Sequence, residues 1–296
     1  MADALRTNKE KLVMISVQGA VAPHVRRQAF RIDAEGAPFA LPGVGGITYN
    51  VRVGDPVFGW AGDHIEPGVS TAAKYEKRGE EENRGYNILS CIGNEARVVS
   101  GDAKGARGVV TGHHGGIEHV LVDFDDETLD KLCIDDKILI RSYGQGLRLP
   151  DYPDVKLFNV DPGLLELMEP GEAGGRLQVK VAAVVPAVLM GSGIGSADAA
   201  SGDYDITTTD KAEIARLGLD KLRFGDIVAL ADCDNLYGRS YRRGAVSVGV
   251  VVHSDCLLAG HGPGVATVMT CASPVIEPVL DDGANIGKYL GIGRYR

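Results

Sequence analysis

Glycine clusters placed between short runs of Val and Ile limit how this chain folds more than any other feature. Gly accounts for 40 of the 296 residues, nearly twice the usual share of about 7%. The densest clusters lie at 43–46, 112–116, 191–195 and 260–264. Short β-branched runs bounded by Gly and Asp are typical of strands joined by turns. We therefore predict a mainly β (α+β) fold of barrel- or sandwich-like antiparallel sheets with a few short helices.

Individual elements can be predicted from the same pattern. The strand predictions are Val57–Trp60, His119–Phe124, Lys137–Arg141, Leu177–Val185, Ile227–Ala231 and Ala245–His253. Helical periodicity predicts two helices, Asp210–Leu217 and Pro162–Met168. The length allows one compact unit over 1–296 or two β subdomains, 1–150 and 151–296.

Charge, apolar runs and cysteines indicate the class of partner and the compartment. The net charge of −9 disfavours nucleic acid as a partner, because phosphate binding needs a surplus of Lys and Arg. The N-terminus lacks a secretory pattern, and the longest apolar run, Val179–Met190, contains Lys and Pro, so no membrane partner is predicted. Five scattered cysteines without a CxxC pair favour reduced thiols and a cytoplasmic location. Exposed sheet edges favour a homo-oligomer.

Two polar clusters follow Gly-Asp turns that lead into strands. The turn Gly54-Asp55 precedes the cluster Gly62–Pro67, and Gly225-Asp226 precedes the cluster Asp232–Asn235. If the two turns have related orientations, both clusters lie at the same end of a barrel. Each cluster also has a purely structural interpretation, as a solvated loop or as a turn capped by Asp and Asn side chains.

Carboxylates and imidazoles in these clusters suggest metal ligands. Asp63 and His64 stand side by side, and Asp232 and Asp234 face the same way in an extended segment. His113 or His114, flanked by three glycines, would complete the shell; the alternative is a flexible hairpin tip with exposed imidazoles. Oxygen and nitrogen donors in this combination suit Zn²⁺ or Mn²⁺.

Further residues are candidates for catalysis and for substrate binding. The candidate catalytic residues are Glu66 and His261, as proton shuttles, and His114. The candidate substrate-binding residues are Tyr237 and Arg239, in a cationic aromatic segment, Gly193, in a loop of backbone N–H donors, and His253, at the end of a strand. We place His119, at the start of an alternating strand, on a sheet face rather than in a site.

Several motifs resemble a known family over nearly the whole chain. The strings GDHIEPGVS (62–70), GHHGG (112–116), MGSGIG (190–195), DCDNLYGR (232–239) and VVVHSDCLLAGHGPGV (250–265) resemble the bacterial and archaeal proteins of domain-of-unknown-function family 4438. That family implies no activity. A fainter resemblance, through Gly225-Asp226 and Asp232-Cys233-Asp234, is to the acetamidase/formamidase family, although Asp234 stands where that family has His.

These observations lead to one functional hypothesis and two alternatives. The hypothesis is a metal-dependent hydrolase that acts on a small amide-like or cyclic amide substrate, with a metal-bound water as the nucleophile. The first alternative is a lyase or isomerase that abstracts protons without a metal. The second is a β protein that binds a small ligand without catalysis.

Overall fold

The computed structural model describes residues 5–25, 28–74, 81–191 and 199–296, and its first half forms a closed β-barrel. Six strands close the barrel because β1 pairs with both β9 and β5. In order around the barrel they are β1 (Ile15–Val21), β9 (Lys137–Ser142), β6 (Glu95–Val98), β7 (Arg107–His114), β8 (His119–Asp123) and β5 (Gly68–Ala72). The short β4 (Ile47–Thr48) extends the sheet beside β5. Closure removes the exposed edges that an open sheet would leave.

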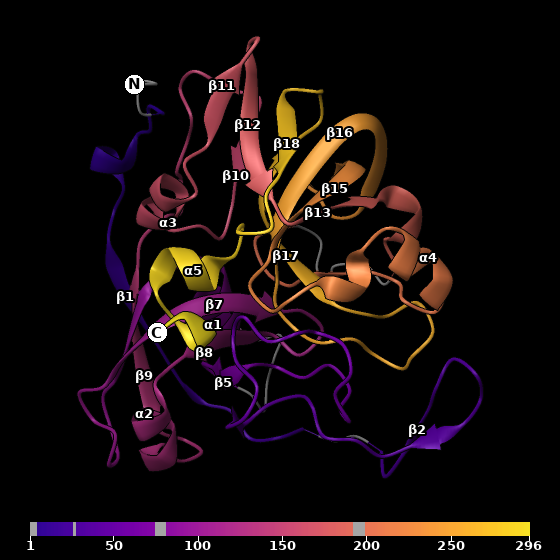
Figure 1. Cartoon of the computed structure of the whole chain (residues 1–296). Coiled ribbons are helices and arrows are strands. Elements are labelled where there is room, and N and C mark those ends of the chain that lie inside the picture. The colour runs from indigo at the N-terminus through magenta and orange to yellow at the C-terminus, as the bar shows by residue number, and fades with distance from the viewer. Residues whose placement is uncertain (1–4, 26–27, 75–80, 192–198) are drawn as a thin grey trace.

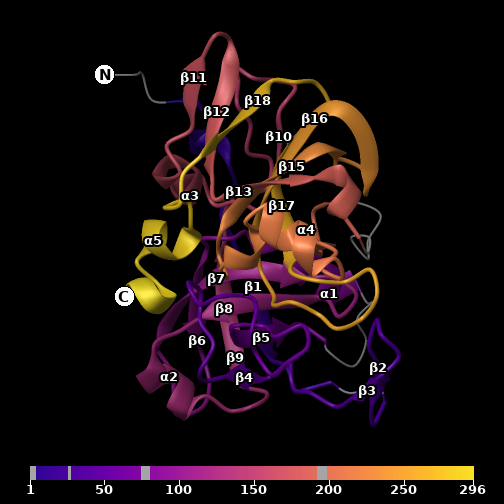
Figure 2. The same ribbon diagram turned by 45° about the vertical axis from the view of Figure 1, so that its right-hand side comes forward.

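The second half of the chain forms two more sheets above the barrel (Figures 1 and 2). The larger sheet has the order β10 (Lys156–Leu157), β17 (Gly264–Cys271), β16 (Ser240–Val251), β15 (Ile227–Asp234) and β13 (Ala183–Pro186), with β14 (Tyr204–Asp205) also on β17. The smaller contains β11 (Gly171–Ala173), β12 (Arg176–Val181) and β18 (Ile276–Leu280). A two-stranded ribbon of β2 (Arg31–Ile32) and β3 (Pro38–Phe39) projects from the body. The mainly β, mostly antiparallel prediction is confirmed, with parallel pairing in β12–β18 and β13–β15.

Both predicted helices form, and each begins at an aspartate cap. Asp161 caps α3 (Pro162–Leu167) and Asp210 caps α4 (Lys211–Arg216), each accepting a backbone N–H of the first turn. Sequence periodicity missed α1 (Glu81–Leu89), α2 (Asp126–Lys131) and α5 (Ile286–Leu290), which are too short or too polar to show an apolar stripe. The 3₁₀ turns are Lys9–Lys11, Ala187–Leu189, Leu219–Lys221 and Gly293–Tyr295. None of the helices among the described residues is long and apolar enough to cross a membrane.

Two strand predictions need correction. Val57–Trp60 is irregular chain, because Val57 is bound by single backbone contacts to Leu222 and Asp255 rather than by a ladder. The run Leu177–Val185 breaks into β12 and β13, which join different sheets.

The boundary predicted near residue 150 falls in the loop between β9 and β10. One apolar core joins residues of the barrel, such as Leu121, to residues of the larger sheet, such as Val250.

The burial of the thiols predicts how the folded chain reacts with a thiol reagent. Cys133 is exposed and the other four cysteines are buried. Burial also raises the pKa of Cys91 to about 12 and that of Cys233 to about 11, which keeps both thiols protonated and unreactive. We expect about one thiol per chain to react rapidly with Ellman's reagent before denaturation. Cys133→Ser should abolish that fast phase; rapid reaction of several thiols in the variant would contradict the described packing.

Candidate functional site

The two Gly-Asp turns lie side by side, but the polar clusters that follow them do not. Gly54 N donates to Phe224 O at 2.8 Å, which pairs the start of one segment with the start of the other. Strand β15 then carries Asp232 and Asp234 to its far end. There Asp232 accepts the N–H of Gly244, near the start of β16, whereas His253 follows the end of β16. Among the described residues, no group of potential metal ligands with atoms within 4.8 Å of one another includes Asp232 or Asp234. The two aspartates therefore do not share a site with His64.

Four histidines from three regions of the chain meet between the barrel and the larger sheet. The ring centroids of His114 and His253 are 4.4 Å apart, and that of His64 lies 5.7 Å from His114, 5.0 Å from His253 and 5.2 Å from His261. His114 ends β7, His64 lies in the 62–67 loop, and His253 and His261 flank the 254–260 loop.

Two glycines, Gly112 and Gly264, allow the segments that carry the histidines to approach one another closely. A Cβ on Gly112 would lie 2.2 Å from Cγ1 of Val252, so only Gly lets β7 pass beside the chain that carries His253. A Cβ on Gly264 would lie 1.9 Å from Oδ2 of Asp203 and 2.3 Å from Nε2 of His253. Asp203 and His253 thus occupy the space that a side chain at position 264 would need.

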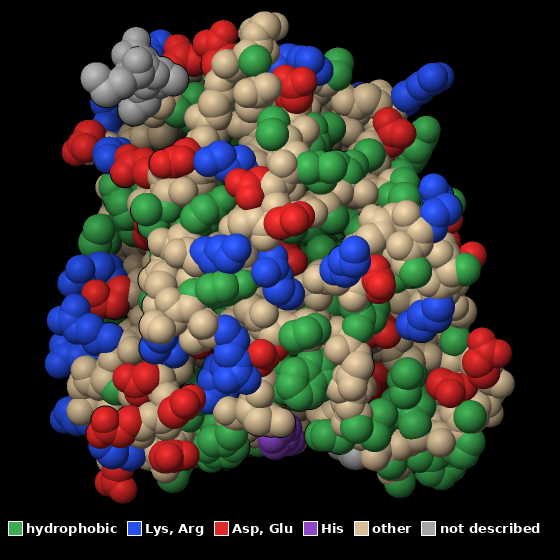
Figure 3. Space-filling model, in the orientation of Figure 1, with side chains coloured by type: hydrophobic (Ala, Val, Ile, Leu, Met, Phe, Trp, Pro, Cys, Tyr) green, Lys and Arg blue, Asp and Glu red, His purple; other side chains and the backbone are tan. Residues whose placement is uncertain are grey.

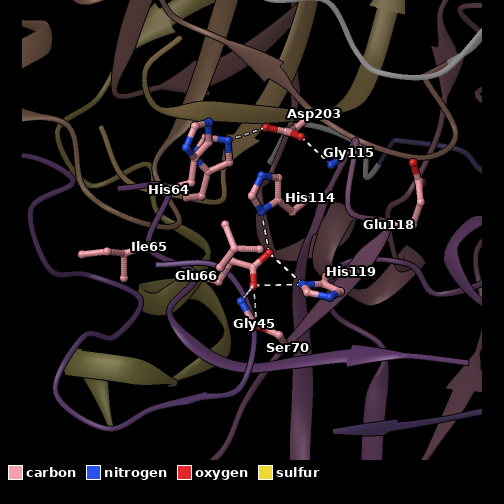
Figure 4. A network of polar contacts seen from close by, with 12 residues as sticks. Gly45, His64, Ile65, Glu66, Ser70, His114, Gly115, Glu118, His119 and Asp203 are labelled. Carbon is pink, nitrogen blue, oxygen red and sulfur yellow. Dashed lines mark hydrogen bonds and ion pairs between the residues drawn. The ribbon is translucent and has the colours of Figure 1, made fainter. Parts of the chain in front are cut away.

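Glu66 is the buried centre of the hydrogen bonds beneath the cluster (Figure 4). Its Oε1 accepts from His114 Nδ1 at 2.5 Å and its Oε2 accepts from Ser70 Oγ at 2.5 Å. Gly45 N donates to Oε2 at 2.6 Å, and His119 Nδ1 lies 3.0 Å from both oxygens. Burial alone would raise the pKa of Glu66, but the two imidazoles lower it well below its ordinary value. Both oxygens are engaged, so Glu66 holds His114 in position and has no free oxygen for a proton shuttle.

Asp63 orients His64 in a similar way. Its Oδ2 lies 3.3 Å from His64 Nδ1 and accepts from Arg31 on the β2–β3 ribbon at 2.9 Å. Burial would raise the pKa of Asp63, but the hydrogen bond and charge of His64 lower it. Burial lowers the pKa of His64, and the other imidazoles lower it further against the hydrogen bond of Asp63. His64 has a left-handed backbone (φ 54°), a conformation that non-glycine residues adopt mainly where the surroundings enforce it.

Asp203 and Asp205 face the cluster from β14 and the residues before it. His253 Nε2 lies 2.7 Å from Asp203 Oδ2 and 3.3 Å from Asp205 Oδ1. Burial lowers the pKa of His253, but the charges of Asp203 and Asp205 raise it well above the ordinary value. Within the described chain, neither His253 Nε2 nor Asp203 Oδ2 has an aligned hydrogen-bond partner. The short contact is therefore electrostatic, and both atoms point into the cluster.

In three rings the hydrogen bond of Nδ1 leaves Nε2 as the nitrogen that could coordinate a metal ion; Nε2 of His64 lies 3.3 Å from His261 Nδ1, and Nε2 of His253 lies 2.7 Å from Asp203 Oδ2. His64, His114 and His253 each direct Nδ1 at an oxygen; the acceptors are Asp63, Glu66 and the carbonyl of Ser254. An Nδ1–H donated in this way leaves a lone pair on Nε2, which is the arrangement found behind metal-binding histidines. One ring nitrogen from each of the three lies within 4.8 Å of the others. A bound cation would replace the proton that the raised pKa of His253 retains.

A cavity of about 640 Å³ opens onto the cluster. His64, His114 and His261 line its polar end, and His261 is partly exposed. The apolar part of the lining is contributed by Val25, Phe39, Leu41, Pro42, Val44, Ile117 and Leu258, and the lining also includes the polar side chains of His24, Gln28, Arg31 and Asp63. The face drawn in Figure 3 shows Lys and Arg interspersed with Asp and Glu, and histidine surface only at its lower edge. His64, His114 and His253 are buried.

Several predicted site residues lie elsewhere. His113 points away from its neighbour His114 and donates Nε2–H to Ser90 O at 2.5 Å; burial lowers its pKa to about 4. Tyr237 is exposed, and Arg239 bonds the carbonyl of Met190 and packs over Tyr204, outside the cavity lining. Gly193 lies outside the described residues.

Sequence reasoning missed Asp203, Asp205 and His119. In an extended segment, residues two apart face the same side, so the sequence Asp203-Tyr204-Asp205 indicates a pair of carboxylates. Asp232 and Asp234 show the same spacing, and the spacing alone does not distinguish the two pairs. His119 was placed on a sheet face; that face holds the buried Glu66.

The fold and site together define a mainly β protein with a closed barrel and a buried histidine–aspartate cluster. Family models of the domain of unknown function DUF4438 match this chain, the N-terminal model over 30–166 and the C-terminal model over 167–290. The chain therefore belongs to the DUF4438 family. A solved structure titled "Crystal structure of TM1086" is similar, with 53% identity, a TM-score of 0.91, and coverage of 97% of this chain and 99% of that chain. No curated protein matches the sequence.

The burial of Glu66 predicts a large effect of removing its charge. Glu66→Gln should lower the free energy of unfolding by about 3–5 kcal/mol at pH 7, because two buried imidazoles lose their charged partner. The control Glu127→Gln removes an exposed partner of Lys131. It should change the free energy of unfolding by no more than about 0.5 kcal/mol. Chemical denaturation monitored by circular dichroism measures both.

The same variant predicts a pH dependence. Because the pKa of Glu66 is lowered in the folded state, its stabilisation is present above the ordinary carboxyl value of 4.5 and is lost as the pH falls below it. The difference in the free energy of unfolding between wild type and Glu66→Gln should become smaller as the pH is lowered from 5. A difference that is constant across that range would contradict an ionised Glu66.

Proposed function

We propose that this protein is a metal-dependent hydrolase that acts on a small amide-like or cyclic amide substrate. The divalent ion, Zn²⁺ or Mn²⁺, would be held by His64, His114 and His253 together with Asp203. One observation carries the proposal: three buried imidazoles, each with Nδ1 directed at an oxygen, place one ring nitrogen each within 4.8 Å of the others, and two of them line a cavity. Three protein nitrogens with a position open to a cavity are typical of catalytic rather than structural sites.

The chemistry divides between the ion and the chain. A divalent ion in such a site supplies a water of lowered pKa and polarises a substrate carbonyl. His261 is the candidate for moving the proton, because its side chain is 33% exposed at the cavity and its Nδ1 lies 2.7 Å from Asp205 Oδ2. Asp205 orients that ring, as a carboxylate orients the base in other hydrolytic sites. Glu66 is a positioning residue.

The cavity supports a small substrate with a polar group and an apolar body. Its lining combines the imidazoles of His64, His114 and His261 with the apolar side chains of Phe39, Leu41 and Ile117. An amide carbonyl at the histidines and a ring or short chain at the apolar wall match this division. The motif that resembles the acetamidase/formamidase family lies at the far end of β15, so the substrate class rests on the cavity and the metal chemistry.

Two adjacent histidines provide a matched test of the metal centre. His114→Asn should weaken binding of Zn²⁺ at least about 100-fold and abolish turnover. His113→Asn keeps a hydrogen-bond donor for Ser90 O and should retain both Zn²⁺ binding and turnover. Metal content is measured by mass spectrometry on protein purified without a nickel column. Wild-type protein that retains no stoichiometric divalent ion after loading and gel filtration would refute the proposal.

Substrate identity and reaction type can be tested together. We expect the Zn²⁺- or Mn²⁺-loaded protein to turn over at least one member of a panel of small linear and cyclic amides. Hydrolysis in H₂¹⁸O should place one ¹⁸O in the product carboxylate. Turnover without ¹⁸O incorporation would instead support the lyase or isomerase alternative, and metal binding without any turnover would support a ligand-binding protein.

A further inference from the structure

We propose that the cluster binds two divalent cations bridged by Asp205, an inference that rests on the proposed metal centre and extends it. The potential ligands form three overlapping groups, each with ligand atoms within 4.8 Å of one another. The groups are His64–His114–His253, Asp203–Asp205–His253 and His64–Cys256–His261. His64 and His253 are each shared by two groups, so the donors extend further than one shell of bonds of about 2.0–2.2 Å reaches.

Asp205 connects the two ends of this extended cluster. Its Oδ1 lies 3.3 Å from His253 Nε2, and its Oδ2 lies 2.7 Å from His261 Nδ1. The two oxygens of one carboxylate therefore face two different imidazoles. A carboxylate that bridges two cations presents its oxygens in this way, and the cations of two-metal hydrolytic sites stand about 3.5–4 Å apart.

The inner position is enclosed by protein. Asp203, Asp205 and His253 form one of the groups whose ligand atoms lie within 4.8 Å of one another, and Nδ1 of His253 is already engaged by the carbonyl of Ser254. His253 is fully buried, and its Nε2 and the Oδ2 of Asp203 lack aligned hydrogen-bond partners in the described part of the chain. Buried polar atoms without partners are uncommon, and a cation at this point satisfies both.

The outer position borders the cavity. His64 Nε2 and His261 Nδ1 are 3.3 Å apart, which is close to the separation of two nitrogens on one tetrahedral ion with bonds of about 2.0–2.1 Å. Cys256 belongs to the same group of ligand atoms within 4.8 Å, and Oδ2 of Asp205 lies 2.7 Å from His261 Nδ1. In this arrangement His261 would be a ligand of the outer cation, in place of the proton carrier of the mononuclear proposal. Both His64 and His261 line the cavity, so the outer cation would meet the substrate, while the inner one is held behind it.

Ion stoichiometry tests the inference with Mn²⁺ as the probe. Chelator-treated protein is loaded with Mn²⁺, passed through gel filtration and analysed for metal; wild type should retain about two ions per chain. His261→Ala removes an outer ligand on a partly exposed side chain and should retain about one. His24→Ala, a histidine that lines the same cavity outside the donor groups, should retain two. Circular dichroism checks that each variant is folded, and Asp205→Asn serves as a second, nearly isosteric variant.

Electron paramagnetic resonance gives an independent readout. Two Mn²⁺ ions bridged by a carboxylate should give an exchange-coupled multiline spectrum, which reverts to the six-line spectrum of isolated Mn²⁺ in His261→Ala and Asp205→Asn. One ion in wild type, with no change in His261→Ala, would overturn the two-cation inference and leave the mononuclear hydrolase intact. Two ions without coupling would overturn bridging by Asp205. No ion at all would refute the proposed function itself.

Discussion

The structure of the site depends on a single buried carboxylate. Glu66 accepts hydrogen bonds from two imidazoles, a serine hydroxyl and a backbone N–H, and it is inaccessible to solvent. A buried charge is tolerated only when its oxygens are fully satisfied. Each donor comes from a different segment, so the charge can be buried only if β5, β7, β8 and the 43–46 loop are all in place. The barrel and the geometry of His114 are therefore set by the same interaction.

The second organising factor is close backbone approach. Gly112 and Gly264 allow β7 and β17 to pass where any side chain would collide with Val252 or with the Asp203–His253 pair. The histidine cluster lies where the barrel and the larger sheet are nearest. A site at such a junction can draw its ligands from distant parts of the sequence, and its groups are held by packing on both sides.

The sequence allowed the fold class to be predicted because local signals dominate in this chain. The β-branched runs and the Asp caps of α3 and α4 act within a few residues, and the structure confirms them. Helix α2 escaped prediction because Leu129 is its single apolar residue, and α5 because it spans only five residues. The run Leu177–Val185 appeared continuous because alternation does not reveal where a strand changes sheets.

The site could be predicted only in part, because its assembly is long-range. His64 was predicted from its position beside Asp63, His253 from its position at the end of a strand, and His114 and His261 from Gly-rich segments; the four rings do meet. Asp232 and Asp234 were chosen on the assumption that similar turns lead to the same end of a barrel. The turns do lie together, but β15 is long enough to carry these aspartates to its other end. Asp203 and Asp205 reach the site only through the pairing of β14 with β17, which nothing in the local sequence encodes.

The two sides of the cavity have separate origins in the chain. The imidazole end is fixed by Glu66 and by the loops that the barrel supports, whereas much of the apolar wall comes from residues 24–44, which include the projecting β2–β3 ribbon. Arg31 on that ribbon donates to Asp63, which orients His64. Substitutions in the ribbon can therefore change the shape of the cavity while the hydrogen bonds of Glu66 that position His114 stay the same.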